Sequence, residues 1–332
     1  MAEVSDPTAN VLRNFKCMCR LLNEDINQEI LSQLSISDED AKKGKGVSEI
    51  VVEADLTPGN ARALAAALLA PPGMSKMLGD VYTALKTLKI WRSNLGASGV
   101  SAIAELLRLG GADLQLALLE LVDAGVEIDG AVALGRSLAT GMNVSLRILR
   151  LDYNPGIGSE GIAALSRGLR TNRSLEELHA CFCSLGPEAG VFLADILEFS
   201  QSSLRVLNVQ GNRLEGVGLN DVAHGLMENS ALLELNVADN AIGNSELDVV
   251  ALRVLAQVIS SGNPISALTS VDLQHNRIGF EGGSVLVPCL QANNKRIKTF
   301  LVDFSIPAEI FTALHRTGDK SGKKKKGKKK KK

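Results

Sequence analysis

The chain has 332 residues, of which 45% are hydrophobic and only 3% aromatic, and its formal net charge is −1. This composition suits many small aliphatic layers better than one large, aromatic-rich core. The sequence holds no span of 18 apolar residues, so no transmembrane segment is predicted. It also holds no secretory signal, which favours a cytoplasmic protein.

The first elements expected along the chain are helical. Residues 5 to 34 carry apolar side chains at steps of three or four, begin with the helix start signal Ser5-Asp6-Pro7, and favour a break near Asn23. The predicted role of this segment is a cap over the first repeat, and the alternative is a docking helix for a partner. Residues 35 to 46 read as a charged linker, so residues 1 to 46 are predicted to form an N-terminal helical cap and linker.

An aliphatic frame, L-x-x-L-x-L, then repeats along most of the chain. Successive copies start 28 to 31 residues apart, except where insertions near residues 70–83 and 244–250 lengthen the interval. The sequence does not decide whether these insertions are binding loops or tolerated decoration. The copies start at Val47, Leu85, Leu116, Leu146, Leu175, Leu204, Leu232, Leu268 and Ile297.

Each copy has room for one strand and one helix. Leu204, Leu207 and Val209 alternate as in a strand, whereas Val222 and Leu226 follow helical spacing. Such a βα hairpin is only half-buried by itself, and stacked hairpins bury a continuous core.

Small polar residues follow the strand in most copies. A buried amide at this place can satisfy the backbone groups that the turn leaves unpaired, and thereby form a ladder between copies. Cys183, Ser93 and Ser305 are predicted to serve the same turn in their own copies. The asparagines of the predicted ladder are Asn154, Asn212, Asn240 and Asn276.

One glycine turn also fits a dinucleotide-binding fingerprint. Gly156, Gly158 and Gly161 form a G-x-G-x-x-G between a predicted strand and a predicted helix. Glycines recur at equivalent places in other copies, as at Gly96 and Gly99, whereas a phosphate-binding turn occurs once in a domain. The recurrence favours a structural turn, and no cofactor is predicted.

The frame LxxLxLxxNxLGxxGxxxLxxxL resembles the ribonuclease-inhibitor type of leucine-rich repeat. The resemblance covers residues 47 to 306 and implies a right-handed βα solenoid of the α/β class, with a parallel concave sheet, convex helices and a protein partner. A short closing helix after Pro307 completes a predicted solenoid at residues 47 to 316.

The end of the chain has a different charge. Ten of the 36 basic residues and one of the 37 acidic residues lie at 317–332, so this tail carries +9 and the rest of the chain −10. The tail is predicted to be disordered and to tether the protein to a polyanion such as acidic tubulin tails, nucleic acid or anionic lipid. A nuclear import signal, a solubilising end and a segment folded back on the acidic body are the alternatives. The predicted polyanion-binding residues are Lys323, Lys324, Lys325, Lys326, Lys328, Lys329, Lys330, Lys331 and Lys332.

A partner site on the body is predicted on the concave side. Residues between the inward leucines face this side in aligned rows, and they include the only tryptophan of the chain. Aromatic and arginine side chains are frequent interface anchors, although the rings could merely cover neighbouring strands. Cations are expected towards the N-terminal side and acids towards the C-terminal side. The predicted protein-binding residues are Lys89, Trp91, Arg92, Arg150, Tyr153, His179, Phe182, Asn208, Gln210, Asp239, Asp272 and His275.

The sequence therefore predicts a non-enzymatic interaction scaffold. The cysteine pairs Cys17/Cys19 and Cys181/Cys183 lack the C-x-x-C spacing of a metal site, and no nucleophile, base and orienting acid converge. Leucine-rich-repeat subunits of ciliary and flagellar axonemes are similar in repeat type, which makes a structural subunit near microtubules one alternative. Activators of the small GTPase Ran also resemble the chain in architecture. However, no residue of this chain, Arg213 included, can be matched to the catalytic arginine of those activators.

Overall fold

The computed structural model describes residues 7–35, 46–69, 80–290 and 294–318. The predicted linker, most of the insertion near residues 70–83 and nearly all of the lysine tail lie outside this part of the chain.

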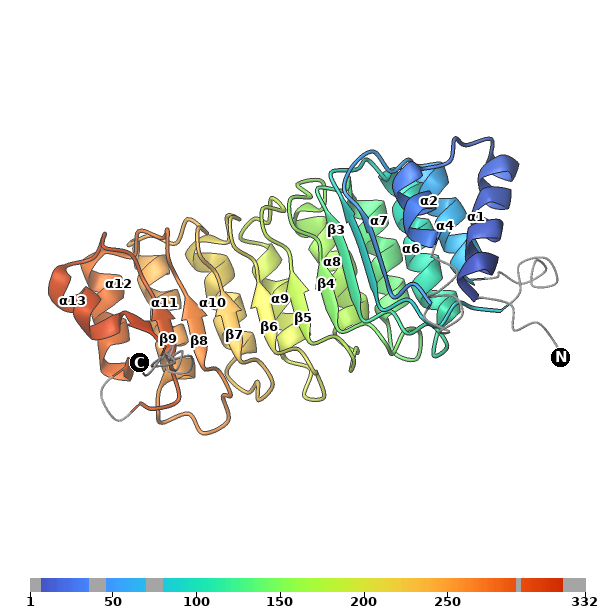
Figure 1. Ribbon diagram of the computed structural model, residues 1–332. Helices are drawn as coiled ribbons and strands as arrows, with labels where there is room; N and C mark the ends of the chain where they lie inside the picture. Colours follow the sequence, from blue (N-terminus) through green and yellow to red (C-terminus); the bar gives the residue numbers. More distant parts are fainter. Residues whose placement is uncertain (1–6, 36–45, 70–79, 291–293, 319–332) are drawn as a thin grey trace, which may run out of the picture.

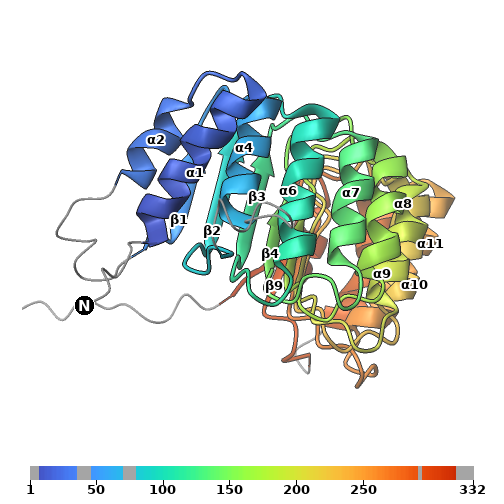
Figure 2. The same cartoon turned by 90° about the vertical axis from the view of Figure 1, so that its right-hand side faces the viewer.

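Two helices stand at the N-terminal end, α1 (Pro7–Leu22) and α2 (Gln28–Leu34). They are separated where Asn23 takes a positive φ of 55°, so the predicted break near this residue is confirmed. The side chain of Asn27 accepts a hydrogen bond from the amide of Ile30 and thereby caps α2. Helix α1 packs against the first repeat helix (Figure 2). Phe15 of α1 is fully buried.

The repeats build one ten-stranded sheet in which the strands follow one another in chain order (Figure 1). The first nine strands pair in parallel, one for each predicted copy of the frame, and confirm the predicted parallel sheet. The last strand pairs antiparallel with the ninth and was not predicted. The strands are β1 (Glu49–Val52), β2 (Thr87–Trp91), β3 (Leu118–Val122), β4 (Ile148–Arg150), β5 (Glu177–His179), β6 (Val206–Asn208), β7 (Glu234–Asn236), β8 (Ser270–Asp272), β9 (Thr299–Leu301) and β10 (Arg316–Thr317).

A helix follows each parallel strand, and the helices form the outer, convex layer (Figure 2). Residues 244–250 do not form a separate loop, because Ser245 caps helix α11 through a capping box with Asp248. The helices of this layer are α4 (Pro58–Leu69), α6 (Gly96–Gly110), α7 (Ile128–Leu138), α8 (Gly158–Leu169), α9 (Ala189–Leu197), α10 (Glu215–Gly225), α11 (Glu246–Ile259), α12 (Gly279–Leu286) with the 3-10 turn η1 (Val287–Leu290), and α13 (Ala308–Leu314).

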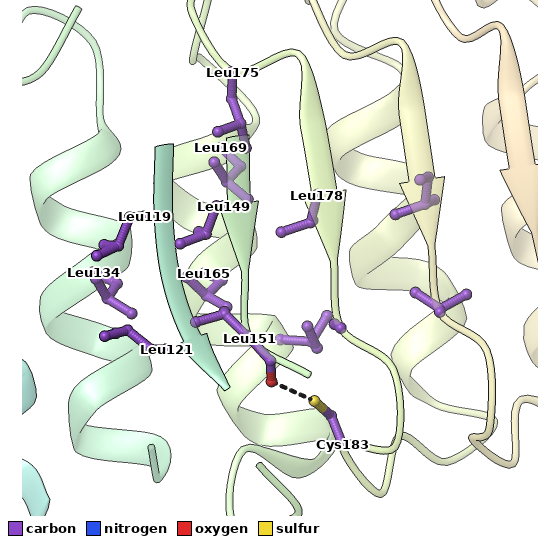
Figure 3. Packing of buried hydrophobic residues seen from close by; sticks show 14 of the residues in the cluster. Leu119, Leu121, Leu134, Leu149, Leu151, Leu165, Leu169, Leu175, Leu178 and Cys183 are labelled. Carbon is purple, nitrogen blue, oxygen red and sulfur yellow. Dashed lines mark hydrogen bonds between the residues drawn. The ribbon is translucent and has the colours of Figure 1, made fainter. Parts of the chain in front are cut away.

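The core lies between the two layers as a continuous aliphatic stack (Figure 3). Leu149 and Leu178 point inward from adjacent strands, and Leu165 meets them from a helix; all three are fully buried. Because each unit buries its leucines against the next unit, the hydrophobic stabilisation comes from stacking and not from any single hairpin.

The predicted asparagine ladder is present where strands give way to helices. The Oδ1 atom of Asn212 accepts hydrogen bonds from the amides of Cys183 and Leu185, both at 3.0 Å. Its Nδ2 atom donates to the carbonyls of Ala180 at 2.9 Å and Val209 at 2.7 Å. The side chain thus satisfies backbone groups of its own unit and of the preceding one.

Two of the three predicted substitutes, Cys183 and Ser93, take the same place in their units, whereas Ser305 is exposed. The Cys183 thiol donates to the carbonyl of Leu151 at 3.1 Å (Figure 3), and the Ser93 hydroxyl accepts from the amide of Leu56 at 3.1 Å. Cys183 and Ser93 each support the turn with fewer hydrogen bonds than an asparagine.

A second asparagine ladder, which the sequence reasoning missed, lies at the opposite edge, where helices give way to strands. The Oδ1 atom of Asn172 accepts from the amides of Ser174 at 2.9 Å and Leu175 at 2.7 Å, and its Nδ2 atom donates to the carbonyl of Leu138 at 2.7 Å. The signal was an asparagine three residues before the first aliphatic residue of the frame. Asn143, Asn229 and Asn294 make the corresponding bonds to Leu107, Leu197 and Ile259.

The glycine turn at residues 156–161 is structural. The amide of Gly158 donates to the carbonyl of Cys183 at 3.1 Å, and the amide of Gly161 donates to Ile157 at 2.8 Å within α8. A phosphate cradle needs such amides free to point at the ligand. The structure therefore supports the repeat interpretation of these glycines.

Candidate functional site

The register of the sheet places the predicted concave rows side by side. The residues of one row, here the central row, are partners across each pair of adjacent strands, as with Arg150 and His179 or His179 and Asn208. Their side chains point away from the buried leucines because side chains alternate along a strand. The central row is Val51, Lys89, Glu120, Arg150, His179, Asn208, Asn236, Asp272 and Leu301.

A parallel row two residues earlier was overlooked in the sequence, although the same alternation predicts it. It adds partly exposed aliphatic side chains at Leu118, Ile148 and Val206 and an exposed carboxylate at Glu234. The concave face defined by these rows is therefore less polar around β3, β4 and β6 than the predicted site residues suggested. An interface with an apolar centre and a polar rim has this character.

The cations near the N-terminal end of the concave face are neutralised by acids. The Nζ atom of Lys89 lies 2.7 Å from Glu49, and the guanidinium of Arg92 lies 3.8 Å from Glu53. The hydrogen bond to Glu49 is also the main reason why the pKa of Lys89 lies above its ordinary value. These cations lie at the predicted end of the rows, and the acids beside them neutralise their charge.

Trp91 and Arg150 share one carboxylate. The indole Nε1 of Trp91 donates to Oε2 of Glu120 at 2.8 Å, and a guanidinium nitrogen of Arg150 lies 3.8 Å from Oε1 of the same side chain. The Nε atom of Arg150 lies 3.4 Å from the carboxylate of Asp152. This carboxylate also accepts a hydrogen bond from the amide of Cys181 at 2.9 Å. This chain of contacts fixes the tryptophan and arginine in place without enclosing them.

Acids without an ion pair in the described part of the chain remain on and beside the concave face: Asp123, Glu234, Asp239 and Asp272. Burial raises the pKa of Asp272, and the nearby Asp303 carboxylate acts in the same direction. Because every cation of the rows is paired, the remaining charge of the face is negative. The predicted separation into a cationic and an acidic side is thus corrected to an acidic surface with locally neutralised cations.

The residues just after the strands form a row with an unusual backbone, here called the exit row: Arg92, Asp123, Tyr153, Phe182, Gly211, Asp239 and His275. All have φ between 46° and 71°, in the left-handed region. This conformation turns the chain from strand to helix while the amide of each residue still bonds to the next unit, as from Tyr153 to Cys181 at 2.8 Å.

The exit row holds the main aromatic feature of the site. The rings of Tyr153 and Phe182 are stacked, with centroids 4.8 Å apart and planes 8° from parallel. The Phe182 ring also covers Gly211, where any Cβ would collide with it. Tyr153 remains 54% exposed, so the stack presents a ring surface to solvent on the rim of the concave face.

The other predicted site residues also lie on this surface. His179 contacts Glu177 at 3.2 Å, while its Nδ1 atom is buried and has no hydrogen-bond partner among the described residues. Asn208 and Gln210 are part-buried and bonded to each other through the Gln210 amide at 3.2 Å. Exposed His275 faces Asp303 at 3.8 Å. The predicted site residues therefore lie along the sheet as one surface.

Two buried cysteines have raised pKa values. Burial, reinforced by Glu24, raises the pKa of the Cys19 thiol to about 11, and burial raises that of Cys183 to about 12. Such thiols stay protonated near neutral pH and are poor nucleophiles and metal ligands. Among the described residues, no group of three or more His, Cys, Asp or Glu side chains is placed to hold a metal ion.

The geometry defines a class of protein: a right-handed βα solenoid that offers one long surface. A family model described as "Leucine Rich repeat" matches residues 143–166, 200–223 and 266–287, which contain β4, β6 and β8. The mouse ribonuclease inhibitor is 27% identical over 231 residues, or 68% of this chain and 47% of the relative. Human NACHT, LRR and PYD domains-containing protein 5 is 29% identical over 211 residues, or 63% of this chain and 16% of the relative.

The repeats of this chain are therefore similar to the leucine-rich repeats of the ribonuclease-inhibitor type. The match of this chain spans less than half of the length of either curated relative. A solved tropomodulin C-terminal domain from Caenorhabditis elegans is 17% identical and aligns with a TM-score of 0.40 over 52% of this chain and 95% of that domain. None of the helices in the described ranges has the length and hydrophobicity needed to cross a membrane.

Proposed function

We propose that the protein is a non-enzymatic scaffold that binds a protein partner across its concave face, with the Tyr153–Phe182 stack as an anchor. The observation that carries this proposal is the solvent-facing stack itself, because a ring pair held on a rigid backbone loses little entropy on binding. The repeat type supports a protein-binding role, and the name of the mouse relative, ribonuclease inhibitor, describes a protein that acts on another protein.

The surroundings of the stack favour a protein partner over a small molecule. Partly exposed apolar side chains such as Leu118 and Ile148 lie on the face beside the charged and polar side chains of the central row. A small ligand needs a concave pocket that buries most of its surface, whereas a protein partner needs a broad surface of this composition.

The test is affinity capture from native cytosol with three forms of the full chain. The double variant Tyr153→Ala/Phe182→Ala removes the stack, and Phe280→Ala removes an aromatic side chain that is 64% exposed on the convex helix α12. A protein partner of the concave face is retained by the wild type and by Phe280→Ala and is lost with the double variant. Equal retention by all three forms would contradict the proposed site.

The lysine tail supports a second, separable part of the proposal, the tether to a polyanion. Its charge of +9 favours attraction to acidic surfaces such as tubulin tails, and that attraction weakens as salt screens it. Co-sedimentation with microtubules, compared between the full chain and a chain ending at Arg316, tests this part. Equal sedimentation of both chains would remove the tail from the binding mechanism.

A further inference from the structure

We propose that the acidic concave face binds a lysine-rich peptide segment, and that its occupant in the free protein is the tail of the same chain, residues 323–332. Occupancy by the tail competes with the protein partner, a consequence that rests on the proposed function. The binding of the tail itself does not depend on it.

The first support is the charge of the surface. Lys89, Arg92 and Arg150 are all engaged by acids, so they do not repel an incoming lysine. Glu234 and Asp239 are exposed and unpaired among the described residues, and both belong to the unit of β7. Together with Asp272 in the next unit, these separate carboxylates suit a flexible, multiply charged peptide better than a single ion.

The second support is where the described chain ends. Strand β10 turns back along β9, with Thr317 opposite Thr299, so the chain leaves the solenoid at the sheet and not at the convex helices. Asp272 lies one strand further in, on β8. The tail therefore starts beside the acidic surface.

The third support is length. The 14 residues after Gly318 can extend to about 46 Å at about 3.3 Å per residue. Strands lie about 4.8 Å apart, so the seven spacings from β10 to β3 need about 34 Å. Lys323, five residues after Gly318, reaches about 16 Å, which is the distance to β7 with Glu234 and Asp239. The lysine run is thus placed over the unpaired acids from β7 to β3.

Tethering strengthens a weak electrostatic contact. A short flexible linker gives the bound segment an effective concentration on the order of millimolar, so an intrinsic dissociation constant of about 0.1 mM still leaves the tail mostly bound. The contact is exposed and therefore sensitive to ionic strength, because the Debye length is only about 8 Å in physiological salt.

The experiment uses a fluorescein-labelled synthetic peptide with the sequence of residues 320–332 and follows its binding by anisotropy at low and high salt. The full chain is compared with a full-length variant in which every lysine of 323–332 is replaced by glutamine, so that the tail no longer occupies the face. We expect the peptide to bind this variant about tenfold more tightly than the wild type at low salt. Equal affinity for the two proteins would overturn occupancy by the tail.

Two triple variants, made in the glutamine-tail background, locate the peptide. The concave triple is Glu234→Gln/Asp239→Asn/Asp272→Asn, which keeps side-chain shape and the hydrogen bond that Asp272 accepts from Gln274. The convex triple removes the same charge from exposed acids of helices α8, α11 and α12, and is Glu160→Gln/Glu246→Gln/Glu281→Gln.

We expect the concave triple to weaken peptide binding at least tenfold and the convex triple to change it less than twofold. Equal losses would mean general attraction to an acidic body and would overturn the concave location. None of these measurements uses the protein partner. Binding of the tail can therefore be disproved while the Tyr153–Phe182 anchor is kept, and the anchor can be disproved while binding of the tail is kept.

Discussion

The two edges of the sheet solve the same folding problem but leave different surfaces. At both edges the chain turns between a strand and a helix, and at both a buried asparagine, such as Asn212 or Asn172, satisfies the backbone groups of two units. Only the strand-to-helix edge also carries the exit row, whose left-handed residues display side chains as different as Tyr153 and Asp239. The comparison teaches that the ladder fixes the backbone, so that the side chain at the neighbouring position can differ from unit to unit.

The largest expected effect on stability comes from the ladder at the strand-to-helix edge. Asn212→Ala removes four hydrogen bonds to buried backbone groups, of which only the Val209 carbonyl keeps a second side-chain donor, Asn240. We expect a loss of about 3 kcal/mol in the free energy of unfolding. Asn172→Ala, at the other edge, removes three such bonds, and we expect about 2 kcal/mol.

Denaturant unfolding of the purified variants checks both values. The matched control is Asn208→Ala on the concave face, where the amide accepts a single local hydrogen bond from Gln210 and the expected loss is below about 1 kcal/mol. A control as damaging as Asn212→Ala would show that the ladder has no special role.

A smaller effect on stability is expected at Gly211, where the left-handed backbone of the exit row meets the aromatic stack. Gly211 has φ 71° and lies under the Phe182 ring, so Gly211→Ala introduces both backbone strain and a steric collision. We expect a loss of about 2 kcal/mol, of which about 1 kcal/mol is recovered in the Phe182→Ala background because the collision disappears.

A double-mutant cycle of unfolding free energies separates these two contributions. If Gly211→Ala lowers the free energy of unfolding equally with and without the Phe182 ring, the ring does not pack on the glycine. The exit row would then not combine a strained backbone with the aromatic stack.

The smallest effect concerns the acidic surface and its pH dependence. Because burial raises the folded-state pKa of Asp272, its charged form costs stability at neutral pH. This cost is absent below the ordinary aspartate pKa and present once the pH exceeds the folded-state value. We therefore expect Asp272→Asn to be slightly more stable than the wild type at pH 7 and equal to it at about pH 3.

Thermal unfolding at several pH values measures this difference, with the exposed Asp123→Asn as the matched control. A variant less stable than the wild type at pH 7, or a difference that grows towards acid pH, would contradict the sign.

Most of the fold could be predicted because the aliphatic frame is strictly periodic. The alternation around Leu204, Leu207 and Val209 fixes which side chains enter the core, and it therefore also fixes the rows that leave it. Ladder positions such as Asn154 could be predicted for the same reason. The ladder at Asn172 has an equally periodic signal, since each of its asparagines lies three residues before the frame, but an asparagine before a strand is also common in ordinary loops.

The chemistry of the surface was harder to predict because it depends on contacts between units. Row membership places Trp91 near Glu120 but does not show that the indole donates to the carboxylate, nor that this same acid also faces Arg150. The left-handed backbone at Tyr153 has no sequence signal, since a tyrosine does not favour that conformation. Strand β10 contains only Arg316 and Thr317, which is too short for any periodicity to be detected.

The central claim is that the stacked rings on the concave rim anchor a protein partner. The direct measurement is the dissociation constant of the captured partner for three full-length forms: the wild type, Tyr153→Ala/Phe182→Ala and Phe280→Ala. The account predicts at least tenfold weaker binding by the double variant, because anchor residues carry most of the binding energy, and unchanged binding by Phe280→Ala. Dissociation constants within twofold of one another for all three forms would contradict it.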